Sequence, residues 1–308
     1  MTGLHRALDD YLRVRESLGY KITEPRRMLG QFVAYLETTG VDVVTTQAAV
    51  AWATQPQGCQ PGWWARRFGL VRRFAVYLHT IDPRHEVPPA GLVVGKHRRA
   101  TPYLYSEAEI AALLAAAGRL RSPQRAATYQ TLMGLLAVTG LRIGEAIHLD
   151  RDDVDLTAAL VTIRDAKFGK TRQVPLHPST VDALAAYTRR RNQLCPRPSS
   201  PAYFLSTTGT RLFYNSFHRV FAGLVRDAGL QPRSPSCRPR PHDLRHSFAV
   251  RTLLEWHRDG VDVAARLPLL STYLGHVHPG ATYWYLSGAP ELFALVADRL
   301  EAALGELP

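Results

Sequence analysis

The first 80 residues place apolar side chains at helical spacing, with short polar breaks between the stretches. Leucine and tyrosine recur every three to four positions from Leu4 to Leu12, and Gly19 stands where a glycine commonly ends a helix. The same spacing predicts further helices over residues 28–36, 45–54 and 61–78. We therefore expect residues 1–82 to form a small helical domain.

Residues 83–104 interrupt this periodicity with prolines, glycines and a basic run, which is typical of a linker between domains. A new helix is expected after Ser106, because Ser106 and Glu109 have the spacing of a capping box. The second domain is therefore placed at residues 105–308.

The second domain combines helices with one predicted β-hairpin. Apolar residues alternate on both arms of this hairpin, Val161 and Ile163 on one and Val174 and Leu176 on the other, with residues 168–170 as the turn. The rest of the domain reads as helices and loops. The predicted fold is mainly α-helical with one small antiparallel β-hairpin or sheet.

Charge narrows the class of partner. Lys and Arg number 38 and Asp and Glu 26, giving a net charge of +12. Residues 1–100 carry 14 basic and 8 acidic side chains and the rest carries 24 and 18, so both parts have the same excess. All but four of the basic residues are arginines, whose planar guanidinium suits phosphate recognition. A polyanion bound by both parts, most commonly a nucleic acid, is the expected partner.

Other sequence features favour the cytoplasm. No apolar run reaches the ~18–20 residues that a membrane-spanning helix needs, and the first residues lack the apolar stretch of a signal peptide. The three cysteines, Cys59, Cys195 and Cys237, have neither disulfide-framework nor zinc-knuckle spacing. We expect a cytoplasmic protein with reduced thiols.

Five elements follow one another along the second domain. They are T-G-L-R-I-G-E ending at Glu145, Lys167 in the hairpin, H-D-L-R at residues 242–245, L-G-H at residues 274–276, and Tyr285. In order and spacing they resemble the tyrosine recombinases of the phage integrase family, including Xer-type and transposon-encoded members. The resemblance covers essentially the whole chain and implies a SAM-like core-binding domain, a linker and an α+β catalytic domain.

The resemblance implies that DNA is cut without metal or cofactor, through a 3′-phosphotyrosyl intermediate. Tyr285 matches the nucleophile, and Arg142 and Arg245 match two arginines that hold the non-bridging phosphate oxygens. Lys167 matches the hairpin lysine that protonates the leaving 5′ oxygen, a role that arginine could not fill because it keeps its proton.

Three further residues take supporting roles in the same resemblance. His242 matches the histidine that helps to accept the tyrosine proton, and His276 matches the one that hydrogen-bonds the scissile phosphate. Glu145 resembles an acidic residue that orients Arg142.

The same histidines allow a different reading, a metal site made from closely spaced imidazoles. Its candidate ligands would be His242, His246, His276 and His278. The H-E-x-x-H pattern is absent, and Asp243 is the only obvious acidic ligand, so we expect no metal.

Two pairs of residues compete for one role each. Lys170 competes with Lys167, but the family pattern places the acid five residues before Arg172 and leaves Lys170 to contact the DNA backbone. Tyr283 competes with Tyr285, and on a helix the two project about 200° apart, so both cannot face one phosphate. The spacing from L-G-H selects Tyr285.

Other basic residues are candidates for contacts with DNA phosphates: Arg66, Arg67, Arg73, Lys96, Arg98, Arg99, Lys170 and Arg172. Arg66 and Arg73 are seven residues apart and share one helix face. The alternative for these helical arginines is an ordinary solvated face, and the sequence leaves both open.

The implied function is site-specific recombination, in which mobile DNA is integrated, excised or resolved. The implied partners are double-stranded DNA with inverted-arm sites and a homotetramer, with or without another recombinase. The apolar stripe over residues 292–304 predicts an exchange helix that docks on a neighbouring subunit, or one that folds back on its own domain. Residues 246–273 form a longer segment than Xer-type proteins have, so contacts there do not follow from the resemblance.

Two other functions use the same residues differently. A type IB topoisomerase would relax DNA with similar chemistry, and a non-catalytic accessory protein would bind DNA without cutting it. The N-terminal helices argue against a topoisomerase, and the intact catalytic set argues against a non-catalytic accessory protein.

Overall fold

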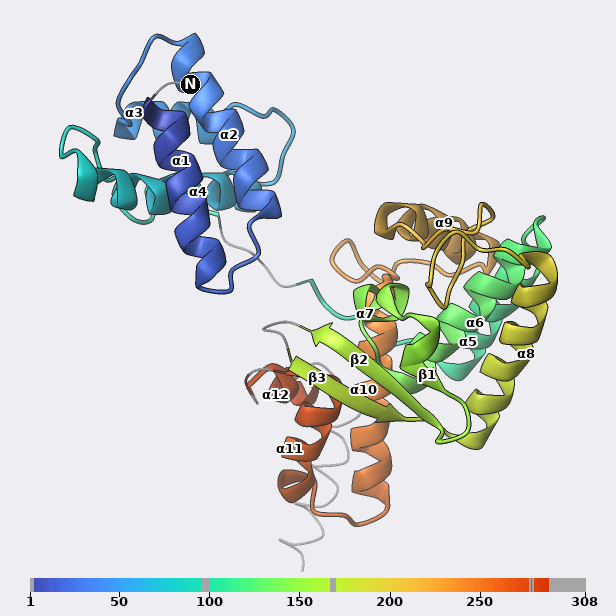
Figure 1. Cartoon of the computed structure of the whole chain (residues 1–308). Coiled ribbons are helices and arrows are strands. Elements are labelled where there is room, and N and C mark those ends of the chain that lie inside the picture. The colour runs from blue at the N-terminus through green and yellow to red at the C-terminus, as the bar shows by residue number, and fades with distance from the viewer. Residues whose placement is uncertain (1–2, 96–99, 167–169, 277, 279, 288–308) are drawn as a thin grey trace, which may run out of the picture. The chain divides into compact units, whose positions relative to one another are not determined.

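A computed structural model describes residues 3–95, 100–166, 170–276, 278 and 280–287. Contacts within the chain divide it into two compact units, Met1–Arg99 and Ala100–Pro308 (Figure 1).

The N-terminal unit is built from helices, as predicted (Figure 1). They are α1 (Gly3–Ser17), α2 (Thr23–Thr38), α3 (Thr46–Thr54) and α4 (Pro61–Ile81). Their apolar stripes meet in one core, in which Phe32 and Phe74 are fully buried and Trp52 packs edge-on against Phe32. Gly19 and Gly40 follow α1 and α2 with positive φ angles, which explains why these helices end there.

The segment expected to be a linker, residues 83–104, is packed on one unit near its start and on the other near its end. The Val44 N–H donates to Nδ1 of the buried His85 over 2.9 Å, which ties the start of the segment to the N-terminal unit. Tyr103 is buried in the core of the second unit. Half of the described residues of this segment are exposed, and residues 96–99 lie outside the described residues.

The second unit is mostly helical and contains one short 3₁₀ turn, η1 (Arg151–Asp153). Its helices are α5 (Glu107–Gly118), α6 (Pro123–Thr139), α7 (Ile143–His148), α8 (Pro178–Leu194), α9 (Tyr214–Asp227), α10 (Pro241–Arg258), α11 (Val263–Leu274) and α12 (Gly280–Ser287). The predicted capping box starts α5, with Ser106 and Glu109 bonding each other's backbone. Among the described residues, no helix is long and apolar enough to cross a membrane.

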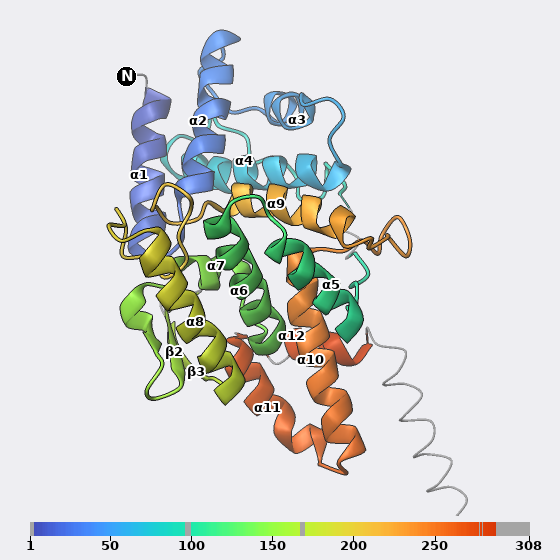
Figure 2. The ribbon, with the colours of Figure 1, turned by 90° about the vertical axis from the view of Figure 1, so that its right-hand side faces the viewer.

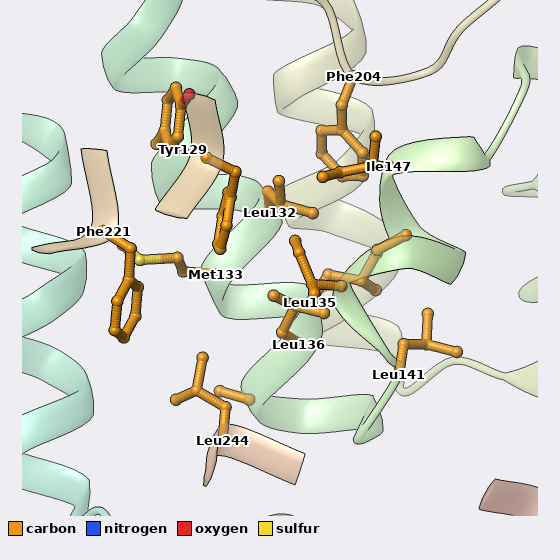
Figure 3. Close-up of a cluster of buried hydrophobic side chains, with 14 of the residues drawn as sticks. Tyr129, Leu132, Met133, Leu135, Leu136, Leu141, Ile147, Phe204, Phe221 and Leu244 are labelled. Carbon is orange, nitrogen blue, oxygen red and sulfur yellow. The ribbon is translucent and has the colours of Figure 1, made fainter. Parts of the chain in front are cut away.

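Helix α6 forms the centre of this unit and contacts α5, α8 and α10 (Figure 2). Figure 3 shows its side chains Leu132 and Leu136 pointing into a cluster that also contains Phe204, Phe221 and Leu244. This core packs α6 against α10. Arg142 follows the end of α6 by three residues, and His242 and Arg245 lie at the start of α10.

Within the described residues, β1 (Val154–Asp155), β2 (Leu160–Ala166) and β3 (Lys170–Pro175) form an antiparallel sheet in the order β1-β2-β3. Val161 pairs with Val174, and both are fully buried, so the predicted alternation of the hairpin is correct. Lys170 begins β3 instead of lying in the turn. The mainly helical fold with a small antiparallel sheet is confirmed.

Candidate active site

Two glycines end the helices that border the candidate site. Gly140 follows α6 and Gly275 follows α11, and both have left-handed φ angles of +62° and +67°. A Cβ on Gly140 would lie 2.5 Å from the Phe248 ring, and one on Gly275 would lie 2.7 Å from the Arg172 guanidinium. The glycines of the T-G-L-R and L-G-H motifs therefore allow both the sharp helix ends and the close packing around them.

Arg245 is held by the backbone at these helix ends. Its side chain is only 1% exposed, and it donates to the Gly140 carbonyl over 2.8 Å and to the Leu274 carbonyl over 2.5 Å. Carbonyls at the C-terminal end of a helix carry partial negative charge and lack intrahelical partners. The two carbonyls stabilise the buried Arg245 guanidinium and leave its full positive charge, which a carboxylate would neutralise.

Arg142 precedes α7 and is fixed from two sides. Its Nη1 donates to Glu145 Oε1 over 2.7 Å, and its Nη2 donates to the Gly275 carbonyl over 3.2 Å. The Glu145 carboxylate also accepts from the Arg142 backbone N–H over 3.0 Å. About a third of the Arg142 side chain stays exposed, so this arginine borders the open side of the site.

Arg172, expected to contact DNA, instead forms an ion pair with Glu145. Its Nη1 and Nη2 donate to the two carboxylate oxygens over 3.1 and 2.8 Å, and its Nε donates to the Tyr273 carbonyl over 2.9 Å. With its side chain 12% exposed, Arg172 connects β3 to the residue that orients Arg142. Burial alone would raise the pKa of Glu145, but the hydrogen bonds and charge of Arg172, assisted by Arg142, lower it to about 2.

His276 connects the arginines to Tyr285. Arg245 Nη2 donates to His276 Nε2 over 3.0 Å, and the Tyr285 hydroxyl lies 3.5 Å from the same nitrogen. On the other edge of the ring, Nδ1 lies 2.7 Å from Oγ1 of Thr282. Burial, and then the charges of Arg245 and Arg142, lower the pKa of His276 to about 4, so this imidazole is neutral near pH 7.

Two more histidines come from the start of α10. The ring of His246 packs edge-on against the rings of Tyr285 and His242, with centroid distances of 5.1 and 5.0 Å. Burial, followed by the charges of Arg245 and Arg142, lowers the pKa of His242 to about 4, although part of its side chain faces solvent. Burial and the neighbouring His242 lower the pKa of His246 to about 3.

The tyrosines of this region occupy different environments. Tyr285 on α12 is buried beside His276 and His246, whereas Tyr283 is 57% exposed. Tyr273 stacks on Phe248 and is a packing residue, as expected. Of these three tyrosines, Tyr285 is the one that reaches the histidines and arginines of the site.

The three candidate arginines of α4 take three different positions. Arg73 is exposed, and Arg66, also exposed, pairs with Glu24. Arg67 is buried, with its guanidinium 3.6 Å above the Trp52 ring and its Nη2 donating to the Trp52 carbonyl over 2.7 Å. The guanidinium of Arg67 therefore packs inside the helical core, and the DNA contact expected of this residue stays a prediction.

The remaining candidates cannot be placed in the site. Lys167, Lys96, Arg98 and Arg99 lie outside the described residues, and the side chain of Lys170 is also outside them. The same holds for the expected exchange helix at the C-terminus. Among the residues that are described, no group of three or more histidine, cysteine, aspartate or glutamate side chains is placed to hold a metal ion.

Sequence reasoning missed three contributors to the site. Thr282 was not singled out, although it lies three residues before Tyr285 and hence one helical turn away. The link between Arg172 and Glu145 spans 27 positions and left no local signal. The carbonyls of Gly140, Leu274 and Gly275 belong to the backbone, and only the helix-ending glycines hinted at them.

Comparison with known proteins agrees with this arrangement. The profile of the phage integrase family matches residues 104–291. A Sinorhizobium fredii protein that carries the name integrase/recombinase y4rB is 46% identical over 307 residues, covering 98% of both chains. The tyrosine recombinase XerC of Azotobacter vinelandii is 30% identical over 297 residues, covering 95% of this chain and 93% of the relative.

Solved structures with a similar fold are more distant in sequence. The Tn1549 transposon integrase in complex with a circular intermediate DNA has a TM-score of 0.65 at 17% identity, covering 92% of this chain and 95% of that one. A lambda integrase dimer bound to a COC′ core site has a TM-score of 0.60 at 17% identity, covering 94% and 97%. Because the family profile covers more than half of the chain and close relatives align over nearly all of it, the protein belongs to the phage integrase family, the site-specific tyrosine recombinases that cleave and rejoin DNA strands.

Proposed function

We propose that Tyr285 is the nucleophile of strand cleavage and forms a 3′-phosphotyrosyl bond. This assignment is supported by the position of the Tyr285 hydroxyl, which lies 3.5 Å from His276 Nε2. Arg245 contacts the same histidine ring. A phenol with its ordinary pKa of ~10 is a weak nucleophile until it loses its proton, so it needs an acceptor within reach. Tyr285 meets that requirement.

Arg245 and Arg142 bind the scissile phosphate in this proposal. Both guanidiniums are positioned by backbone carbonyls or by Glu145 before DNA arrives, and both lie around Gly275 and Leu274. Preorganised donors lower the barrier because they do not have to reorient as charge develops on the phosphate oxygens. They supply the charge stabilisation that the chemistry requires.

The proton balance uses two groups. The Tyr285 proton passes to a neutral histidine, and His242 is the acceptor that the family pattern implies. His242 borders a cluster in which the His246 ring packs on Tyr285 and His276 Nε2 lies 3.5 Å from the Tyr285 hydroxyl. As the tyrosine oxygen bonds to phosphorus, the bond to the 5′ oxygen breaks and that oxygen takes a proton from Lys167. Rejoining reverses these steps, with a 5′ hydroxyl attacking the phosphotyrosyl bond.

We further propose that the DNA substrate carries paired inverted arms and that four copies of the chain join two such sites during the movement of mobile DNA. The net charge of +12, spread over both units, supports an extended DNA contact. The solved complex of the Tn1549 transposon integrase with circular intermediate DNA makes mobile DNA the first substrate to examine.

A matched pair of variants tests the nucleophile. Nicked duplexes from the DNA that flanks the gene would be screened for a covalent adduct, and its peptide would be mapped. Tyr285→Phe should abolish the adduct, whereas Tyr283→Phe should leave its rate within about threefold, because Tyr283 is exposed and outside the site. An adduct on Tyr283, or one that persists in Tyr285→Phe, would contradict the assignment.

A second pair tests the acid. Lys167→Ala should slow cleavage strongly, and a substrate with sulfur at the 5′-bridging position should restore it, because a thiolate leaves without a proton. Lys170→Ala should weaken DNA binding with little change in the cleavage rate. Rescue of the Lys170 variant alone would reverse the two roles.

A further inference from the structure

The entry segment, residues 101–105, leads the chain into the second unit. Its Thr101 carbonyl accepts a hydrogen bond from Arg240 Nη2 over 3.1 Å, just before α10 begins. Its Tyr105 backbone N–H donates to Ser247 Oγ over 2.7 Å, in the second turn of α10. The entry segment and the start of α10 are therefore bound to each other at both ends of the segment.

Asp243 provides the central link between the entry segment and α10. Its side chain has 0% exposure, and its two carboxylate oxygens accept from Arg240 Nε and Nη2, each over 2.9 Å. The same carboxylate accepts from the Tyr103 backbone N–H, in the middle of the entry segment. Burial raises the pKa of Asp243, and the hydrogen bonds of Arg240 and Tyr103 oppose that rise. A buried carboxylate is costly unless its oxygens are hydrogen-bonded, so these donors hold the first turn of α10 in place.

His242, on the same turn of α10, has no link of this kind. Within the described part of the chain its ring makes no hydrogen bond and packs edge-on against His246, which also belongs to α10. The residue before the helix, Arg240, supplies no side-chain cap either, because a guanidinium has no acceptor. The direction of the His242 ring is therefore set by the backbone of the first turn of α10, and this turn depends on Asp243.

We propose that Asp243 is a positioning residue, which fixes the first turn of α10 on the entry segment and so sets where His242 lies relative to Tyr285. The inference rests on the proposed function in taking His242 as the acceptor of the Tyr285 proton. An acceptor must lie within hydrogen-bond reach of its donor, so a small displacement of this turn lowers the rate of cleavage. A displacement of the entry segment reaches His242 by the same route.

Three substitutions separate this role from a packing role. Asp243→Asn keeps the volume of the side chain but turns an NH₂ group towards the donors of Arg240 or Tyr103. Glu109→Gln is the matched control, because the Glu109 carboxylate accepts from the Tyr103 hydroxyl and the Ser106 N–H but lies on α5. Should Asp243→Asn fail to fold, Arg240→Lys tests the same link, because it keeps the charge and removes the paired donors.

The first measurement is the single-turnover rate of adduct formation at a saturating concentration of the nicked duplex that the wild type cuts, with DNA affinity measured separately. Asp243→Asn should be slower by about tenfold to a hundredfold, with an affinity within about threefold of the wild type. Arg240→Lys should be slower by about threefold to tenfold, because one ammonium cannot replace two paired donors. Glu109→Gln should leave both values within about threefold. Equal losses of rate in Asp243→Asn and Glu109→Gln would overturn the proposal.

The second measurement reads the position of His242 in the DNA-free full-length chain by NMR with ¹³C-labelled histidine, using His242→Asn and His246→Asn to identify the two sets of ring signals. Asp243→Asn should move the His242 signals towards those of a solvated imidazole and weaken the contact between the two rings, whereas Glu109→Gln should match the wild type. Unchanged His242 signals in Asp243→Asn would overturn the inference.

The two measurements together separate the inference from the proposed function. Moved His242 signals at an unchanged rate of cleavage would contradict the acceptor role that the proposed function gives to His242. A wild type that forms no adduct on Tyr285 would contradict the proposed function and leave the NMR result readable.

Discussion

The N-terminal and catalytic units both bury an arginine, and the two side chains do different things. Arg67 lies on the Trp52 ring and donates to the Trp52 carbonyl, so one residue supplies both of its contacts. Arg245 donates to the carbonyls of Gly140 and Leu274 at two helix ends and to His276. Both have a buried Nε without a partner among the described residues, so an unpartnered donor does not distinguish a site from a core.

The two arginines differ in the chemistry of the residues around them. Arg245 shares its surroundings with a neutral histidine and a tyrosine hydroxyl, all capable of exchanging protons or binding an anion. Arg67 is surrounded by the aromatic core of a helical domain. Burial of a charge is therefore informative about function only when other reactive groups converge on the same point.

The largest expected effect on cleavage appears when the two buried arginines are replaced by lysine in two separate variants. Arg245→Lys should slow adduct formation by about 10²–10³-fold, because one ammonium cannot bond two carbonyls and His276 and also hold a phosphate. Arg67→Lys should leave the rate within about twofold and lower the free energy of unfolding by about 1 kcal/mol through the lost stacking on Trp52. Single-turnover cleavage and urea unfolding measure the two effects.

An equal loss of cleavage in both variants, each still folded, would contradict the different roles given to Arg245 and Arg67. Arg67 would then have to act on DNA despite its burial. Circular dichroism of each variant, taken before the assay, keeps a folding defect from being read as a catalytic one.

Glu145 should produce the next largest effect. It joins Arg142 and Arg172, so Glu145→Gln replaces an acceptor by an NH₂ group that faces guanidinium donors. Adduct formation should fall by about tenfold to a hundredfold, with a smaller change in DNA affinity. Arg172→Ala should reproduce part of the loss, because Arg142 and Glu145 remain paired. An Arg172→Ala defect confined to DNA affinity would instead support the original expectation of a DNA contact.

Glu145 also predicts a dependence of stability on pH. Its pKa is lowered from the usual 4.5 to about 2 in the folded chain. A lowered pKa means that the folded state favours the carboxylate, so the stabilisation is present above the unfolded pKa and is lost as the pH falls from about 4.5 towards 2. It amounts to about 3 kcal/mol at neutral pH, by linkage. Urea unfolding should show a shallower loss between pH 4.5 and 2 in Glu145→Gln than in the wild type, and parallel curves would refute the assignment.

Local signals in the sequence predicted much of this fold. The helix end near Gly19, the capping box at Ser106 and the pairing of the hairpin all depend on residues close together in the chain. The separation of Tyr283 from Tyr285 likewise followed from helix geometry, and the structure exposes the first and buries the second.

Features that depend on distant residues did not follow from the sequence. Arg66 and Arg67 are adjacent, and which one is buried is decided by Trp52 on another helix. The pairing of Arg172 with Glu145 likewise depends on the tertiary arrangement of β3 and α7. Strand β1 has only two residues, too few for an alternating pattern to appear.

The smallest expected effect concerns the exposed face of α4. Of the three candidate arginines on α4, Arg73 and Arg66 are exposed and Arg67 is buried, and Arg66 is paired with Glu24. Arg73 is therefore the best placed of the three to neutralise a phosphate. Arg73→Ala should weaken binding to a short duplex of arbitrary sequence and reduce the slope of log K against log salt by about 0.9, the value for one lost phosphate contact. Arg67→Lys should leave that slope unchanged, and Arg66→Ala should change it less than Arg73→Ala, because Glu24 already competes for Arg66. Fluorescence anisotropy over a salt series gives all three slopes. An unchanged slope for Arg73→Ala would mean that α4 presents an ordinary solvated face, and the DNA contacts of the N-terminal unit would then have to lie elsewhere on it.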